Sequence, residues 1–220
     1  MPFSKYFATL ALVAVAAAKG PCDILAAAGN PCVAAHSTVR ALYEAYDGPL
    51  YNVTRSSDDQ SALIGVLSSG GFANKSAHDQ FCSKLDCVIS NVMDQSGLGN
   101  HLGRRHKLVN ASWHPITVGK DKTPVYGMWF GPGYGYHVDN TTSIATDNDP
   151  ESIYAVMSGK NFNGRCCFDY GECCFAITVS VVSPCQCALS LWLWLGVGVG
   201  VGVDLWLGLG LGLALELGLR

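Results

Sequence analysis

The most constraining feature of this sequence is an abrupt change of composition near residue 172. Residues 19–171 contain 12 Lys and Arg and 14 Asp and Glu, which is the mixture of a soluble globular protein. Residues 172–220 contain only four charged residues and consist mostly of Leu, Gly and Val. A packed domain must therefore be built largely from residues 19–171, which are enough for one domain of ordinary size.

The first 18 residues are typical of a secretory signal peptide. Lys5 precedes an apolar run over residues 7–18, and the run ends in three alanines. A positive start, a short apolar core and small residues at the end describe an export signal. The run is too short to cross a bilayer, which takes about 20 residues, and a buried N-terminal helix is the alternative. We expect a secreted, extracellular protein.

Export makes asparagine-linked glycosylation possible. Four Asn-x-Ser/Thr sequons occur, at Asn52, Asn74, Asn110 and Asn140. A sequon is a short pattern that also arises by chance, so each one is a candidate site. Together the four sequons agree with the predicted signal peptide.

Six of the ten cysteines lie in the soluble part of the sequence, in three close pairs. The pairs are Cys22 with Cys32, Cys82 with Cys87, and Cys166 with Cys167. An exported protein can form disulfides, but six cysteines allow many pairings, so the residues alone leave the connectivity open. Cys166 and Cys167 can bond to each other or to separate partners. The cysteine spacing and the six histidines form no metal-ligand motif, so we expect neither a metal site nor a cofactor.

The soluble part favours an all-β fold. Short runs rich in Val, Ile, Tyr and Phe alternate with Gly, Asn, Asp and Pro, which is typical of a β-sandwich or barrel. The expected strands cover residues 50–53, 64–67, 88–92, 125–130 and 153–157. One early helix is expected over residues 34–43, where apolar residues recur at helical spacing. The formal net charge of -3 argues against a protein that grips nucleic acid.

Eight short segments occur in the same order as in one known family. They are residues 20–24, 31–38, 40–43, 48–51, 64–68, 94–97, 99–102 and 164–171. In this order they closely resemble the fungal α-L-arabinofuranosidases of glycoside hydrolase family 54. The resemblance covers about residues 20 to 171, the N-terminal part of the family's catalytic domain only. It implies a concanavalin-like β-sandwich, here truncated, with disulfides Cys22–Cys32 and Cys82–Cys87.

The resemblance also implies a sugar-binding role for three residues near the end of the matched region. It pairs Cys166 with Cys167 in a vicinal disulfide on which the furanose ring packs. A rigid, polarizable sulfur pair is a suitable apolar platform for one face of a small sugar. Asp169, two residues further on, can hydrogen-bond a sugar hydroxyl. The alternative for Asp169 is a turn in which it bonds its own backbone.

The family hydrolyses terminal non-reducing α-L-arabinofuranosyl residues of arabinan or arabinoxylan with retention, which needs two carboxyl groups about 5–5.5 Å apart. In the family both carboxyl groups follow the stretch that matches residues 164–171, and nothing in residues 172–220 matches that later part. Asp147, Asp149 and Glu151 are typical of a solvated turn. We therefore expect no catalytic residue in this chain, which is then inactive. The alternative is a secreted remnant that at most binds carbohydrate.

Residues 172–220 form a low-complexity tail that resembles no part of the family. From residue 189 onward, 12 Leu and 8 Gly dominate in alternating Gly-Val and Leu-Gly repeats. The tail is long enough to span a membrane, but it is dense in glycine. It lacks the polar spacer that precedes the hydrophobic part of a glycolipid-anchor signal. Its glycines are not placed between a strand and a helix, as they are in a nucleotide-binding loop. We interpret the tail as translation of a repetitive nucleotide tract, from an intron or a shifted frame, and expect no stable membrane anchor.

Overall fold

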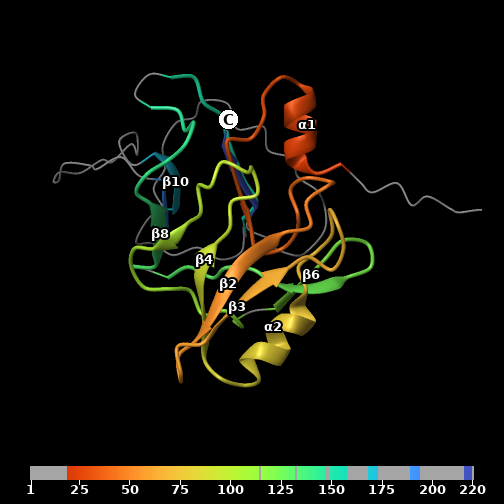
Figure 1. The fold of residues 1–220 in the computed structure, drawn as a ribbon, viewed down its shortest axis with the longest axis vertical. Helices are drawn as coiled ribbons and strands as arrows, with labels where there is room; N and C mark the ends of the chain where they lie inside the picture. Colours follow the sequence, from red (N-terminus) through yellow and green to blue (C-terminus); the bar gives the residue numbers. More distant parts are fainter. Residues whose placement is uncertain are drawn as a thin grey trace, which may run out of the picture.

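The computed structural model describes residues 19–113, 115–131, 133–146, 149–157, 168–172, 189–193 and 216–219. The described part is built mainly of short antiparallel strands, with two short helices at its periphery (Figure 1). The all-β prediction is confirmed. The predicted signal peptide lies outside the described residues, as does most of the tail.

Within the described residues, the strands form four antiparallel sheets. The first sheet has the order β3 (Ser61–Gly65), β2 (Pro49–Arg55), β4 (Cys87–Val92). The second has the order β10 (Phe168–Glu172), β11 (Leu189–Leu193), β8 (Gly135–Val138), β5 (Gly103–Arg104). The third has the order β1 (Ala34–Ser37), β12 (Glu216–Leu219), β9 (Ile153–Ala155), and the fourth pairs β6 (Pro115–Val118) with β7 (Thr123–Tyr126). Two strands of the Leu-rich tail, β11 and β12, thus pair with strands of the soluble part.

The central strand β2 buries two consecutive apolar side chains. Leu50, Tyr51 and Val53 are buried, whereas Asn52 is only partly buried. Strict alternation would put Leu50 and Tyr51 on opposite faces, but the pairing of β2 with β3 shifts register between Pro49 and Tyr51. Such an irregularity bends the strand and re-aims the side chains, so two consecutive apolar residues both enter the core.

Two of the predicted strand segments, residues 50–53 and 88–92, lie inside β2 and β4. The other three begin inside β3, β7 and β9 but run past the ends of those strands.

The predicted helix over residues 34–43 is wrong. Its first four residues form β1, and the rest is irregular. Most of the segment is buried on every side, so the apolar spacing does not mark one helical face. Its backbone groups bond to distant partners instead: the N–H of Ala41 donates to the Gly71 carbonyl at 2.9 Å. Tertiary contacts override the local pattern here.

Two helices were not expected from the pattern. The first, α1 (Pro21–Ala27), begins with a proline at a position where its missing N–H costs nothing. The second, α2 (Lys75–Cys82), is capped by Asn74, whose side chain accepts a hydrogen bond from the N–H of Ala77 at 3.0 Å. Within the described part of the chain, no helix has the length and apolar character of a membrane span.

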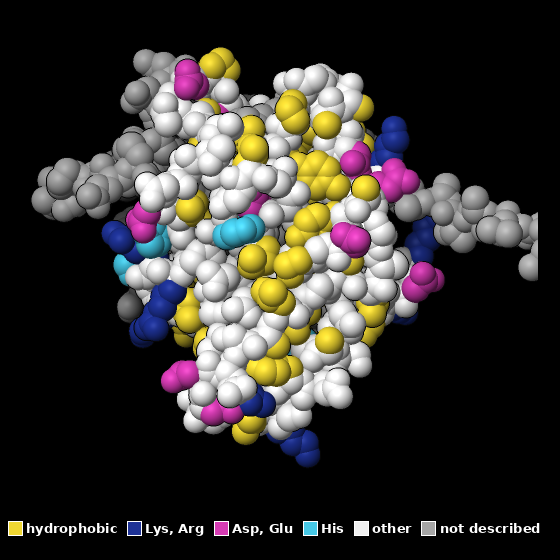
Figure 2. All heavy atoms as spheres, in the orientation of Figure 1, with side chains coloured by type: hydrophobic (Ala, Val, Ile, Leu, Met, Phe, Trp, Pro, Cys, Tyr) yellow, Lys and Arg dark blue, Asp and Glu magenta, His cyan; other side chains and the backbone are white. Residues whose placement is uncertain are grey.

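The main core lies between the β3–β2–β4 sheet and the segments that follow it. Its largest fully buried side chains include Tyr51, Leu50, Ile64, Ile89, Leu102 and Tyr136. Some apolar side chains remain exposed, among them Leu63 on β3. Figure 2 shows apolar side chains interspersed with polar groups along the middle of the face over β2 and β4.

Tyr136 ties three parts of this core together. Its hydroxyl donates to the Ile89 carbonyl of β4 at 2.7 Å and accepts from the N–H of Val109 at 2.9 Å. All three residues are fully buried, so water cannot replace the phenol oxygen. A buried N–H that loses its only acceptor carries the full desolvation cost.

We predict that Tyr136→Phe lowers the free energy of unfolding by about 1–3 kcal/mol, because it leaves the N–H of Val109 unpaired. Urea denaturation of the purified variant measures the change. Tyr134→Phe is the control, since Tyr134 is only partly buried and no hydrogen bond of its hydroxyl is seen among the described residues. Equal stability of the two variants would contradict the prediction.

Candidate functional site

Four of the family-like segments meet in one buried polar cluster. Strand β1 contributes His36, the loop after β4 contributes Asp94 and Asn100, and β10 contributes Tyr170. These residues come from positions far apart in the sequence, and all four are buried. We call them the polar cluster.

Asp94 is the hub of the polar cluster. Its Oδ1 accepts from the N–H groups of Ala35 and Ser96, each at 2.9 Å. Its Oδ2 accepts from the N–H of Asn100 at 3.0 Å and from the hydroxyl of Ser96 at 2.6 Å. Only 5% of Asp94 is exposed. A buried carboxylate with four donors organises the surrounding backbone.

His36 links this loop to β10. Its Nε2 lies 2.7 Å from the Asn100 carbonyl oxygen, and its Nδ1 lies 2.9 Å from the Tyr170 hydroxyl. A carbonyl only accepts, so Nε2 carries the proton and donates; in the neutral ring Nδ1 then accepts from Tyr170. Burial lowers the pKa of His36 to about 4, although Asp94 opposes the shift. The same burial, with Asp94, raises the pKa of Tyr170, so the phenol keeps the proton that it donates.

The Tyr170 contact matters because Asp169, the predicted sugar-binding residue, is its neighbour in β10. The structure places Asp169 in a strand rather than in a turn, with Trp192 of β11 opposite it in the register. Cys166 and Cys167 lie outside the described residues. The polar cluster therefore fixes the strand that follows the predicted vicinal disulfide.

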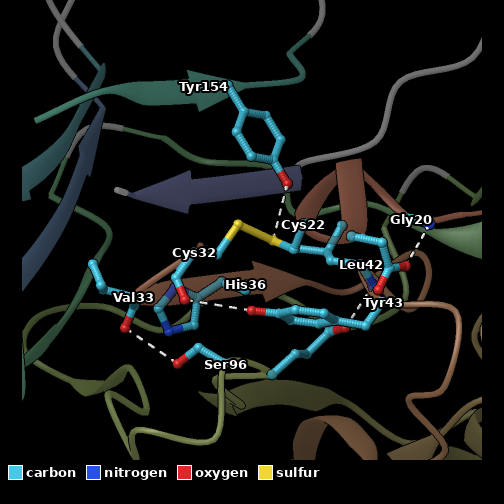
Figure 3. Close-up of a disulfide and its surroundings, with 12 residues drawn as sticks. Gly20, Cys22, Cys32, Val33, His36, Leu42, Tyr43, Ser96 and Tyr154 are labelled. Atoms are coloured by element: carbon cyan, nitrogen blue, oxygen red, sulfur yellow. Dashed lines mark hydrogen bonds between the residues drawn. A yellow bond between two sulfur atoms is a disulfide. The ribbon is translucent and has the colours of Figure 1, made fainter. Parts of the chain in front are cut away.

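A disulfide anchors the other side of the cluster. Cys22 of α1 is bonded to Cys32, and the sulfur of Cys22 lies 4.0 Å from the Tyr154 hydroxyl (Figure 3). The carbonyl of the next residue, Val33, accepts from the side-chain amide of Asn100 at 2.8 Å, and the Ser96 hydroxyl oxygen lies 3.2 Å away. The disulfide therefore holds the chain directly before β1 against the loop of Asp94.

The other short-range bond, Cys82–Cys87, joins the end of α2 to the start of β4. Both disulfides that the resemblance implies for these four cysteines are thus present. They link parts of the chain that are close in sequence, so each constrains a local turn.

The acidic stretch considered as a source of catalytic carboxylates forms a turn where it is described. Asp149 donates its N–H to the Thr146 carbonyl at 3.0 Å, and its Oδ2 accepts from the N–H of Thr146 at 3.3 Å. Asp149 and Glu151 are exposed, and Asp147 lies outside the described residues. Among the residues placed by the structure, no group of three His, Cys, Asp or Glu side chains is arranged to hold a metal ion.

The sequence reasoning did not single out His36, Asp94 or Tyr170 as parts of a site. A signal was present, because all three lie in segments that resemble the family. It also missed a second buried histidine, His78, whose Nδ1 lies 2.9 Å from the Tyr51 hydroxyl and whose Nε2 lies 3.2 Å from the Ser112 hydroxyl. Burial lowers the pKa of His78 to about 4.

The four sequon asparagines have different surroundings. Asn140 is exposed in the loop after β8. Asn52 lies in the central strand β2 with its Oδ1 buried, Asn74 caps α2, and Asn110 accepts from the N–H of Ser112 at 3.0 Å.

Comparison with known proteins decides what this domain is. The sequence profile of the family described as "Alpha-L-arabinofuranosidase B, catalytic" matches residues 21–178. The chain belongs to this family. Related proteins of the family include the probable α-L-arabinofuranosidase B of Aspergillus terreus, 46% identical over 168 residues, and that of Aspergillus fumigatus, 46% identical over 166 residues. These alignments cover 70% of this chain but only 33% and 32% of the relatives.

Solved structures of arabinofuranosidases agree with this family assignment. An arabinofuranosidase complexed with arabinofuranosyl-α-1,2-xylobiose is 42% identical, with a TM-score of 0.67 over 70% of this chain and 34% of that one. The chain thus spans about a third of the length of the arabinofuranosidases that it matches. Membership in glycoside hydrolase family 54 and the fold of its catalytic domain follow for the matched part.

The buried histidine of the polar cluster predicts a pH-dependent stability. Because the pKa of His36 is about 4 in the folded protein and about 6.5 when exposed, only the unfolded chain binds the proton between these values. The contribution of His36 to stability is therefore lost as pH falls from about 6.5 to about 4, by up to roughly 3 kcal/mol, and this histidine causes no further loss at lower pH. We expect His36→Gln to flatten this dependence in part, because His78 contributes in the same direction. Thermal melts across this range test it; an unchanged slope would contradict the role of His36.

The surroundings of the sequons predict selective glycosylation. In a eukaryotic secretory host, Asn140 should carry a glycan, because it is exposed in a loop, whereas folded protein should carry none at Asn52. Mass spectrometry of glycopeptides measures both sites. Asn140→Gln should remove a glycan, with Asn52→Gln as the matched control that leaves the glycan content unchanged. A glycan on Asn52 in soluble, folded protein would show that this strand is more accessible than the structure indicates.

Proposed function

We propose that this domain is the N-terminal part of the catalytic domain of an α-L-arabinofuranosidase. Such an enzyme removes terminal non-reducing α-L-arabinofuranosyl residues from arabinan or arabinoxylan with retention of the anomeric configuration. The profile match over residues 21–178 carries the proposal. It is supported by the arabinofuranosidase relative solved with arabinofuranosyl-α-1,2-xylobiose, which joins an arabinofuranose to a xylan fragment. The predicted signal peptide supports secretion, which would bring the protein to extracellular plant cell-wall polysaccharide.

In this proposal Cys166, Cys167 and Asp169 contact the sugar. The vicinal sulfurs would present a flat apolar surface to the furanose ring, and Asp169 would accept a hydrogen bond from a hydroxyl. Tyr170 is a positioning residue, because its hydroxyl bond to His36 holds the strand that contains Asp169. The polar cluster then connects the sugar-binding strand to the disulfide-anchored N-terminal segment.

We further propose that the 220-residue chain binds arabinofuranose without hydrolysing it. Retaining hydrolysis needs a carboxylate that attacks the anomeric carbon and a second carboxyl group that protonates the leaving oxygen. Asp94 is occupied by four hydrogen bonds, and Asp149 belongs to an exposed turn. The two carboxyl groups that the family uses are expected after the stretch matching residues 164–171, and the profile match ends at residue 178. A secreted protein that binds carbohydrate without catalysis is therefore the second candidate function.

Incubation of the purified chain with 4-nitrophenyl α-L-arabinofuranoside tests the two statements separately. We expect no release of nitrophenol above the buffer rate, together with saturation-transfer NMR signals from bound arabinofuranoside. Asp169→Ala should weaken these signals, and Asp121→Ala, which removes an exposed carboxylate of the β6–β7 turn, should leave them unchanged. Release of nitrophenol would overturn the proposed inactivity. Lack of binding by the wild-type chain would overturn the proposed function of residues 19–171.

A further inference from the structure

The described surface contains one concentrated group of basic side chains. Residues 104–107 read Arg-Arg-His-Lys, in a protein whose formal net charge is -3. Arg104, Arg105 and Lys107 are exposed, and His106 is partly buried. Figure 2 shows Lys, Arg and His side chains gathered along one edge of the molecule, beside β8. We call residues 104–107 the basic segment.

The three exposed cations have no carboxylate partner among the residues that the structure describes. The ion pairs found there are Arg55–Asp58, Lys75–Asp79 and His137–Asp139. The last of these is close to the basic segment, because His137 lies opposite Gly103 in the sheet, but its carboxylate is bonded to the imidazole at 2.8 Å. Burial, Arg105 and His137 together lower the pKa of His106, which agrees with an excess of positive charge at this edge.

The backbone of the basic segment is held in place. The N–H groups of Arg105 and His106 both donate to the Gly135 carbonyl at 3.3 Å. Lys107 donates to the Gly133 carbonyl at 3.1 Å and accepts from the N–H of Gly135 at 3.2 Å. A segment tied by these bonds presents its charges from a preorganised backbone, which reduces the entropy lost on binding.

The register of the second sheet relates the basic segment to the predicted sugar site. Asp169 of β10 lies opposite Trp192 of β11, and Trp192 lies opposite Gly135 of β8. Gly135 in turn accepts the backbone bonds of Arg105 and His106. Three strand spacings therefore separate the backbone of Asp169 from the basic segment, or about 14 Å across the sheet. Arg104 lies opposite Tyr136 in the register and therefore points to the other face of the sheet from Asp169, at the exposed edge of β5.

We propose that the basic segment binds the carboxylates of a uronate-bearing polysaccharide. The inference rests on the proposed function, because that function brings the protein to plant cell-wall polysaccharide. Arginine is suited to this partner, since its planar guanidinium donates two parallel hydrogen bonds to one carboxylate. Each exposed contact is weak, but a polymer engages several at once, and linked contacts add avidity.

Affinity electrophoresis of the full chain in gels that contain polygalacturonate tests the proposal, with carboxyl-reduced polygalacturonate as the neutral comparison. We expect retardation by the acidic polymer only, weakening as salt is added. The variant Arg104→Gln/Arg105→Gln/Lys107→Gln should weaken binding by about tenfold or more, since it removes three exposed charge contacts. Lys84→Gln/Lys120→Gln/Lys122→Gln is the matched control, because it removes the same charge from exposed positions elsewhere.

Several outcomes would overturn the inference: equal loss in both triple variants, equal retardation by the carboxyl-reduced polymer, or equally tight binding of double-stranded DNA. The first would indicate a net-charge effect, and the last a general polyanion surface. Thermal melts of the variants show that each is folded. The readout needs no hydrolysis and no arabinose. Failure of the proposed function would appear in the nitrophenyl arabinofuranoside experiment, and failure of this inference would appear here alone.

Discussion

The carboxylate of Asp94 is the interaction on which the rest of the described structure depends. It accepts four hydrogen bonds, from the strand β1 and from its own loop, and only 5% of the residue is exposed. A buried charge is costly unless donors surround it, so the loop and β1 must keep their relative positions for the charge to be tolerated. The same requirement brings His36 and Asn100 together, because Asp94 accepts from the N–H of Ala35, directly before His36, and from the N–H of Asn100 itself.

Neutral histidine extends this constraint to the predicted sugar-binding strand. With Nε2 bonded to the Asn100 carbonyl and Nδ1 bonded to the Tyr170 phenol, His36 has a partner at each ring nitrogen. In a low-dielectric interior such bonds are strong and directional, and they hold β10 at a defined distance from β1. The chemistry proposed for Asp169 thus depends on residues that never touch the sugar. The basic segment lies at the other edge of the same sheet, where bonds to Gly133 and Gly135 hold it.

Prediction from the sequence succeeded where a local pattern carries the information. The runs rich in β-branched and aromatic residues in β2 and β4 and the short spacing of the first two cysteine pairs are such patterns, and the family resemblance supplied the pairing itself. The prediction failed for residues 34–43. A segment that is buried on all sides can contain apolar residues at the same spacing as the buried face of a helix, so the spacing does not distinguish the two. The prediction also missed α2. Asn74, which caps this helix, was considered in the sequence only as a sequon asparagine. The polar cluster was missed for a different reason: its members come from segments separated by many residues, and no spacing rule relates His36 to Tyr170.

The sequence by itself determined the all-β class, the change of composition near residue 172, and the family to which residues 21–178 belong. These properties depend on residue order and on local patterns. Only the tertiary structure decided that Asp94 is a structural carboxylate, that His36 is neutral, that Asn52 and Asn140 differ in exposure, and that the basic segment shares a sheet with Asp169. Each of these depends on which distant groups surround a side chain, since burial and hydrogen-bond partners set its charge and its access to other molecules.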